Sequence, residues 1–353
     1  IKFIMAYTTI NKSTDYFNTK LYTGNGNTDH AQTGVGFQPD LIWFKNRSVD
    51  DGHIWTDVVR GVTKSIASQS TGAENTYTEM LKSFDSDGFT VGNLNAVNRN
   101  SSNIVSWNWK AGTNGSGNTG GSGTYKTYNY SVNTTAGFSI IKYTGNGTSG
   151  HQIPHHLGAV PSFVIVKRLE NTRHWCVGHA SELWTKAAFL SATDSWDSAY
   201  DYWNNANPTS TSIALSSSVA INGNDETYIM YIFAQKTGYC KIGQYIGNGN
   251  ADGTFIYTGF RPTFILSKKS SGSGTNWTVW DDKRSSSGGN PTNKILHPNV
   301  NNTENTADDT DFVSNGFKLR ATASGMNQNL ESYAYIAFGQ SIVGSNNVPA
   351  TAR

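Results

Sequence analysis

Short apolar runs that end in a basic residue recur along the chain, each shortly after a proline. The runs are LIWFK at 41–45, FVIVK at 163–167 and FILSK at 264–268. Runs of this length, bounded by proline and polar turns, are typical of strands buried on both faces or against a sandwich core. Pro39, Pro161 and Pro262 stand just before the runs, where a missing N–H breaks no central hydrogen bond of a sheet.

The phrases around these runs also recur. YTGNG occupies 22–26 and 143–147, and YIGNG occupies 245–249. Further shared phrases are SDGFTVG at 86–92 and SNGFKLR at 314–320, and aromatic apolar runs close the copies at 104–112, 228–238 and 333–341. Gly-Asn-Gly and Asp/Asn-Gly supply the positive φ values of tight turns, so they indicate turns beside strands. A phosphate-binding loop is disfavoured, because no helix pattern follows the Gly-Asn-Gly phrase.

The three copies predict an all-β chain of three tandem sandwich-like repeats, each of about a hundred residues, because solenoid units are only roughly 20–50 residues long. The predicted divisions are an N-terminal strand or arm (1–20), repeat 1 (21–112), a flexible Gly/Ser/Asn/Thr-rich linker (113–136), repeat 2 (137–238), repeat 3 (239–341) and a C-terminal tail (342–353). We expect repeats 2 and 3 to pack rigidly and repeat 1 to be tethered or linked through a strand. The segment 5–22 has strand-like residues without a partner in its own copy, so it is expected to pair with a neighbouring domain or subunit.

Composition narrows the classes of partner. The 27 basic and 25 acidic residues give a net charge of +2, which disfavours nucleic-acid binding because that needs a basic stripe. No apolar run approaches the roughly 20 residues of a membrane helix, so no membrane insertion is predicted. The two cysteines, Cys176 and Cys240, form no disulfide framework, and the apolar neighbours of Cys176 indicate a buried, unreactive thiol.

Two groups of side chains could bind metals. His151, His155 and His156 offer zinc ligands, yet no matching cysteine or carboxylate cluster accompanies them, so a polar surface loop is favoured. The acidic residues of the second group are Glu304, Asp308, Asp309 and Asp311. They could hold calcium, but they lack the EF-hand spacing, so a solvated acidic loop is favoured. No metal site and no cofactor is predicted.

An acid–base pair recurs beside a tryptophan in two of the copies. It comprises Asp57 with Arg60, and Asp281 or Asp282 with Arg284, while the tryptophans of the three copies are Trp55, Trp175 and Trp277. The second copy lacks the pair, so a structural ion pair is favoured over catalysis. GxSxG and HExxH are absent, and no catalytic residue is predicted.

Aromatic residues cluster in the second copy. They are Trp184, Trp196, Tyr200, Tyr202 and Trp203, with Asp and Asn nearby. Flat rings beside hydrogen-bonding groups can form a glycan-binding face, but packing in a core is favoured.

Long phrases of the chain resemble a repeat of virion proteins from marine bacteriophages, including phages of cyanobacteria and of other abundant ocean bacteria. The phrases are MAYTTINKSTDYFNTKLYTGNG (5–26), GFQPDLIWFKNR (36–47), SFDSDGFTVG (83–92), WNWKAG (107–112), GQYIGNGNADGTFIYTGFRPTFIL (243–266) and DFVSNGFKLR (311–320). Those proteins are usually described as structural or tail-fibre-like, so the resemblance implies a place in the virion and supplies no catalytic residues. The second copy lacks the SDGF-type turn, and the ending SIVGSNNVPATAR departs from the more basic and aromatic ending of the relatives.

These observations predict a non-enzymatic bacteriophage virion structural protein, a tail fibre or surface appendage subunit that presents β-domains for host attachment. The alternatives are a capsid-decorating protein and a carbohydrate-binding protein that recognises host surface glycans. A polysaccharide-degrading enzyme would need a cleft with two facing carboxylates. The expected partners are further copies of the chain, other virion proteins and a host surface glycan. Fibres are often trimers, and the sequence does not fix the number of subunits.

Overall fold

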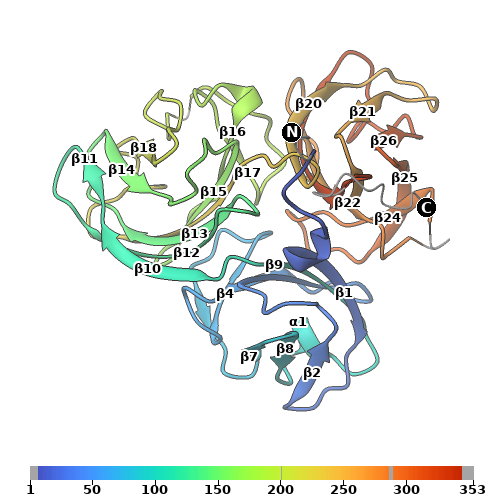
Figure 1. Ribbon diagram of the computed structural model, residues 1–353, viewed down its shortest axis with the longest axis horizontal. Coiled ribbons are helices and arrows are strands. Elements are labelled where there is room, and N and C mark those ends of the chain that lie inside the picture. Colours follow the sequence, from blue (N-terminus) through green and yellow to red (C-terminus); the bar gives the residue numbers. More distant parts are fainter. Residues whose placement is uncertain (1–6, 200, 286–288, 344–353) are drawn as a thin grey trace, which may run out of the picture.

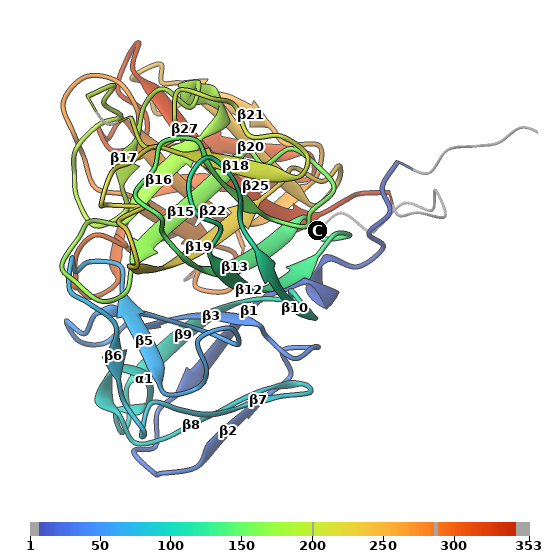
Figure 2. The same cartoon turned by 90° about the vertical axis from the view of Figure 1, so that its left-hand side faces the viewer.

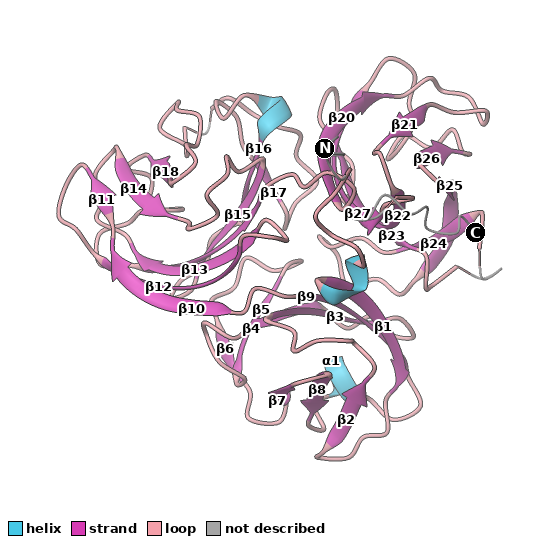
Figure 3. Cartoon of the chain, in the orientation of Figure 1, coloured by secondary structure: helices cyan, strands magenta, loops and turns pink. Residues whose placement is uncertain are grey.

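The computed structural model describes residues 7–199, 201–285 and 289–343, and its regular structure is nearly all β-strand (Figure 3). The helical elements of these residues are η1 (Ser13–Asp15), α1 (Asn95–Asn98) and η2 (Ala180–Glu182). None of the described helices is long and apolar enough to cross a membrane. The predicted all-β class is confirmed.

The described strands group into three units around a common centre (Figures 1 and 2). Unit 1 contains β1 (Phe17–Thr23), β2 (His30–Thr33), β3 (Leu41–Asn46), β4 (His53–Asp57), β5 (Lys64–Ala67), β6 (Asn75–Thr76), β7 (Leu81–Asp85), β8 (Gly88–Val91) and β9 (Asn103–Trp109). Unit 2 contains β10 (Thr113–Asn118), β11 (Gly120–Gly121), β12 (Thr127–Asn133), β13 (Phe138–Thr144), β14 (His151–Pro154), β15 (Phe163–Arg168), β16 (Cys176–His179), β17 (Ala188–Phe189), β18 (Ser212–Leu215) and β19 (Thr227–Phe233). Unit 3 contains β20 (Cys240–Ile246), β21 (Phe255–Tyr257), β22 (Arg261–Lys269), β23 (Thr278–Asp281), β24 (Thr292–Ile295), β25 (Asn305–Val313), β26 (Gly316–Leu319) and β27 (Ser332–Gln340).

Each unit stacks a large sheet on a small one, and the strand order of the large sheets is the same. The orders are β1-β9-β3-β4, β13-β19-β15-β16 and β20-β27-β22-β23, with further strands at some edges. The small sheets contain β2-β8-β7, β14-β18 and β21-β26-β25. Each unit has an apolar core of its own; in unit 1, Ile42 and Phe44 of β3 pack in one cluster with Phe89 and Val91 of β8.

The three large sheets also turn their other faces toward one shared core. In β3, where every residue is buried, Leu41 and Trp43 point the opposite way from Ile42 and Phe44. They join a cluster that includes residues of all three units, among them Trp107, Trp109, Phe163, Tyr231, Phe233, Phe264, Ile336 and Phe338. The prediction of a tethered first repeat is therefore wrong, because unit 1 supplies much of the shared core. The prediction of strands buried on both faces is confirmed.

The Gly-Asn-Gly phrase forms the same turn in each unit. Its second glycine has positive φ, at 71° in Gly26, 71° in Gly147 and 65° in Gly249. Its first glycine lies against backbone, since a Cβ on Gly24 would lie 2.2 Å from the carbonyl oxygen of Arg99. A fully buried asparagine holds the turn by accepting the N–H of the middle asparagine at 2.9–3.0 Å, in the pairs Asn98 with Asn25, Asn222 with Asn146 and Asn327 with Asn248. The amide group of each buried asparagine donates in turn to nearby carbonyls.

The segment predicted as a flexible linker (113–136) is folded into strands. β10 pairs with β12, β12 pairs with β13, and β11 pairs with β14. The glycines of β10 fit tyrosine rings: a Cβ on Gly115 would lie 2.5 Å from Tyr130, and a Cβ on Gly117 would lie 2.6 Å from Tyr128. Glycine here makes room for rings from the neighbouring strand, a known way of stabilising glycine in a sheet, so the linker prediction is wrong.

The N-terminal segment has two kinds of neighbour. Residues 17–23 form β1 and pair with β9 of the same unit, which corrects the prediction that they lack a partner in their own copy. Residues just before them contact unit 3 and the turn that precedes it: the Tyr7 hydroxyl donates to the carbonyl of Gly259, and the Thr8 hydroxyl donates to that of Thr237. The backbone N–H of Ser13 donates to the side chain of Gln340 at 2.7 Å. The two ends of the described chain therefore lie side by side.

Candidate functional site at the seams between units

We use "seam" for the contact between two adjacent units, where most of the buried charged side chains of the described residues lie. Arg60 Nε lies 2.6 Å from Asp57 Oδ2, and Arg284 Nε lies 2.5 Å from Asp281 Oδ2, with all four side chains fully buried. Each aspartate also accepts two backbone N–H groups of the turn that follows it. The predicted structural ion pairs are confirmed, and Asp281 rather than Asp282 is the partner of Arg284.

Each pair receives a hydrogen bond from the adjacent unit. The Tyr231 hydroxyl of unit 2 donates to Asp57 Oδ2 at 2.8 Å, and the Trp107 indole of unit 1 donates to Asp281 Oδ2 at 2.9 Å. Tyr231 and Trp107 hold equivalent positions in β19 and β9. The aspartate of each pair therefore accepts a hydrogen bond that fixes one unit against the next.

The third seam explains why the second copy lacks the pair. Register places His179 of unit 2 where Asp57 and Asp281 stand, opposite Phe163 of β15. The residue equivalent to Tyr231 is Ile336 of unit 3, which has no donor, and His179 Nε2 instead lies 3.2 Å from the backbone carbonyl of Tyr335. A carboxylate here would be buried without its donor, which is costly.

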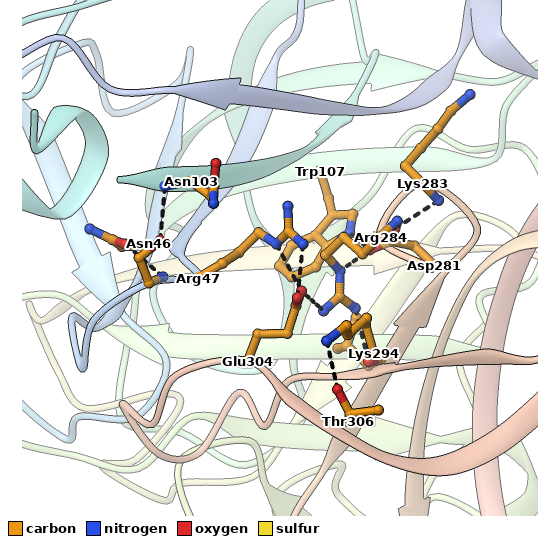
Figure 4. A network of polar contacts seen from close by, with 12 residues as sticks. Asn46, Arg47, Asn103, Trp107, Asp281, Lys283, Arg284, Lys294, Glu304 and Thr306 are labelled. Atoms are coloured by element: carbon orange, nitrogen blue, oxygen red, sulfur yellow. Dashed lines mark hydrogen bonds and ion pairs between the residues drawn. The ribbon is translucent and has the colours of Figure 1, made fainter. Parts of the chain in front are cut away.

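The seam between units 1 and 3 is closed by a further ion pair (Figure 4). Arg47 of unit 1 donates through Nε and Nη2 to the two carboxylate oxygens of Glu304, both at 2.8 Å. Arg284 Nη1 reaches the same carboxylate at 3.1 Å. Burial would raise the pKa of Glu304, but the hydrogen bond from Arg47 and the charge of Arg284 lower it below its usual value. Glu304 is therefore ionised, and its two carboxylate oxygens accept hydrogen bonds from Arg47 and Arg284.

A buried lysine crosses every seam. Lys45, Lys167 and Lys268 end the three apolar runs, and each is fully buried. Their Nζ atoms donate to backbone carbonyls of the next unit, in the pairs Lys45 with Asn301 at 3.0 Å, Lys167 with Thr71 at 3.2 Å and Lys268 with Thr193 at 2.6 Å. Burial lowers the pKa of Lys45 and Lys167 to about 8 and that of Lys268 to about 7.

Two of the three recurrent tryptophans also join units. Trp175 Nε1 donates to the carbonyls of Ala67 and Ser70 in unit 1, both at 3.1 Å. Trp277 Nε1 donates to the carbonyl of Phe189 in unit 2 at 2.8 Å. Trp175 and Trp277 lie four residues before His179 and Asp281. The residue four positions before Asp57 in unit 1 is His53 rather than Trp55, so the predicted alignment of the tryptophans is off by two residues.

Two seams contain hollows. One, of about 340 Å³, lies between units 2 and 3 and is lined by residues 193–197 with Gly272 and Gly274. The other, of about 310 Å³, lies between units 1 and 2 and is lined by Ala73, Glu74, Lys142, Leu169, Glu170 and Thr227. The acidic groups of the second hollow are already paired, since Glu74 contacts Arg60 and Lys64, and Glu170 accepts from Thr227.

The candidate metal ligands are engaged elsewhere. His151 and His155 are buried rather than on a surface loop. The three histidines contact Asn222 and Thr119 (His151), the carbonyl of Thr209 (His155) and the Tyr128 hydroxyl (His156). Burial lowers the pKa of all three. Among the described residues there is no group of three or more His, Cys, Asp or Glu side chains that could hold a metal ion.

The predicted acidic loop is largely a strand. Residues 305–313 form β25, so Asp308, Asp309 and Asp311 lie on it and Glu304 directly precedes it. Asp311 Oδ2 lies 2.6 Å from Arg320 Nε, and Glu304 is held by two arginines. The interpretation as a solvated loop is wrong for Glu304.

The aromatic cluster of unit 2 packs inside the molecule. Trp184, Tyr202 and Trp203 belong to the core of unit 2, and Trp196 belongs to the shared core. Trp203 is fully buried, and the other three are at most 8% exposed. These rings do not form an exposed glycan-binding face, and Tyr200 lies outside the described residues. Cys176 is also buried as predicted, which raises the pKa of its thiol to about 12, and Cys240 is a free, buried thiol too.

Sequence reasoning missed the seam lysines and the turn-holding asparagines. The lysines carried a visible signal, because a basic residue closes each apolar run. The burial of this basic residue follows only from the arrangement of the units. The asparagines carried a short one, since each is the first asparagine of an apolar-Asn-x-Asn phrase before the last strand of its unit: VNRN at 97–100, INGN at 221–224 and MNQN at 326–329.

Comparison with known proteins yields one family. No curated protein and no solved structure matches the chain. A family model described as a domain of unknown function, DUF7483, matches residues 12–341. The match runs through all three units without a break, as the shared core would require of a single folded body. The chain therefore belongs to the DUF7483 family.

Proposed function

We propose that the chain is a non-enzymatic structural protein of a bacteriophage particle, a tail fibre or surface appendage subunit that presents β-domains for host attachment. The observation that supports this most is the closure of three β units on one core, with fully buried ion pairs and lysines across the seams. Such a body resists local opening, because separating two units would expose apolar surface and unpaired buried charges. A particle component exposed to solvent needs this rigidity more than it needs a mobile lid.

The chemistry at the seams supports the same proposal. The seam carboxylates Asp57, Asp281 and Glu304 are held by arginines, and indole, phenol and amine donors are used in contacts between units. Groups fixed in this way build an interface rather than a reaction centre. The resemblance to marine phage virion proteins supports a location in the virion.

The test uses purified particles of a phage that encodes this chain. Mass spectrometry should detect the chain in gradient-purified particles, and immunogold labelling should place it on the tail or appendages. Purified chain added in excess should compete with adsorption of the phage. Labelling of the head surface alone would favour capsid decoration, and absence from purified particles would refute the proposal. Light scattering on the purified chain tests the homo-oligomer.

A further inference from the structure

The outer face of the small sheet in unit 3 carries exposed aromatic rings. Phe255 and Tyr257 lie on β21 with Ile256 between them; Ile256 is buried in the core of unit 3, so the two rings point outward. Phe255 is 46% exposed and Tyr257 is 60% exposed. Tyr7 adds a third exposed ring: its hydroxyl donates to the carbonyl of Gly259, close to the hydroxyl of Tyr257.

The other two units show that the fold does not need these rings. The register of the small sheets aligns Phe255 with Ala31 of unit 1 and Gln152 of unit 2. It aligns Tyr257 with Thr33 and Pro154. The same sheet is therefore built twice with small or polar residues at these positions. Exposed aromatic rings that are not required for folding indicate a contact surface.

The surroundings of the rings favour a small polar ligand over a protein. Lys318 lies directly opposite Phe255 on β26, with its Nζ 2.9 Å from Asp252 Oδ1. Next to it, Arg320 pairs with Asp311, and the Asp252 side chain is 79% exposed. A stable protein interface buries about 800 Å² per partner with twenty or more residues. The strip of three rings is far smaller than this and is bordered by charged, solvent-accessible hydrogen-bonding groups.

We propose that Phe255, Tyr257 and Tyr7 form a saccharide-binding face, on which sugar rings stack while Lys318, Asp252 and Arg320 hydrogen-bond the hydroxyl groups. Rings two residues apart on a strand lie on the same face roughly 7 Å from each other, so one extended ligand can contact both. This inference rests on the proposed role in host attachment and names the class of receptor, a surface polysaccharide. The proposed glycan site therefore lies on the exposed face of unit 3 and not in the buried cluster of unit 2.

The experiment compares three proteins on an array of immobilised bacterial O-antigen and capsular polysaccharides, followed by calorimetry with the best-bound polysaccharide. The test variant carries Phe255→Ala and Tyr257→Thr, the residues that unit 1 has at these positions. The control is Tyr125→Thr, which removes a ring that is 62% exposed in unit 2. The double variant should bind roughly tenfold or more weakly, with unchanged circular dichroism and melting, while the control binds like wild type.

Three results would overturn the proposal. The first is that no polysaccharide binds, and the second is equal binding by wild type and the double variant. The third is loss of self-association by the double variant, which would make the face an interface between copies. None of these changes whether the chain is found in purified particles, so the proposed function is tested separately.

Discussion

Lys268 gives a test of the seams through the pH dependence of stability. Its ammonium group is fully buried and donates to the carbonyls of Thr193 and Thr275. Burial lowers its pKa from 10.5 to about 7 in the folded protein. Between these values the unfolded chain binds one more proton than the folded chain, so the free energy of unfolding rises with pH. The contribution is complete above about pH 10.5 and is lost as the pH falls toward 7.

The magnitude follows from the linkage relation. Each pH unit inside the window adds at most about 1.4 kcal/mol, so this lysine contributes about 2 kcal/mol between pH 7.5 and 9.5. Lys268→Met keeps the aliphatic stem and removes the titrating group. The variant should therefore gain about 2 kcal/mol less than wild type over this interval. Urea unfolding followed by tryptophan fluorescence at five pH values measures the difference, and other titrating groups cancel between the two proteins.

A second lysine provides the control. The pKa of Lys45 is lowered only to about 8, so Lys45→Met should flatten the slope mainly above pH 8 and have a smaller effect than Lys268→Met between pH 7 and 8. Parallel curves for wild type and Lys268→Met across the whole range would refute a buried, titrating lysine at this seam.

Three further substitutions test other contacts. Asn222→Ala removes the clamp of the Gly-Asn-Gly turn and leaves buried backbone groups unpaired, so we expect a loss of about 2–4 kcal/mol in urea unfolding; a loss below about 0.5 kcal/mol would contradict the clamp. Gly147→Ala forces a Cβ into a residue with φ of 71°, and should cost about 1–2 kcal/mol, whereas Gly120→Ala, where a Cβ meets nothing within 4 Å, is the matched control. Trp107→Phe removes the donor to Asp281 and should cost about 1–3 kcal/mol in the same assay, and a neutral result would show that the buried carboxylate needs no donor from unit 1.

Much of the strand content was predictable, because it follows from local patterns. LIWFK, FVIVK and FILSK lie within β3, β15 and β22 as expected. The Asp57–Arg60 pair could also be predicted, since its residues are three apart and recur beside an apolar strand. Burial on both faces could be inferred from the runs. Which face meets another unit could not, because that depends on contacts between residues more than a hundred positions apart.

The segment 113–136 shows how composition misleads. Glycine and serine predict a flexible linker, and that prediction ignores the alternation in TYNYSVN, where Tyr128, Tyr130 and Val132 occupy every second position. The rings of Tyr128 and Tyr130 lie over the glycines of β10, so the two halves of the segment stabilise each other. The aromatic cluster of unit 2 packs in cores, as favoured, and its sequence was ambiguous for a different reason. Trp203 and its neighbours suit a binding face and a core equally well in sequence, and only tertiary structure distinguishes the two.

The seams differ in how strongly they constrain the sequence, and the chemistry of their acceptors explains the difference. Lys45, Lys167 and Lys268 donate to backbone carbonyls, and a carbonyl is present whatever residue carries it. The lysine can therefore recur in all three units while its acceptor residue is Asn301, Thr71 or Thr193.

The aspartate contact joins two side chains, so both must change together. Where the donor becomes Ile336, the aspartate becomes His179 and its arginine is lost, because a buried carboxylate without a partner would destabilise the seam. Restoring only one side, as in His179→Asp, should therefore destabilise the protein, and adding Ile336→Tyr should recover part of the loss in a double-mutant cycle. A loss in the double variant equal to the sum of the losses in His179→Asp and Ile336→Tyr would show that the two positions are not coupled across the seam.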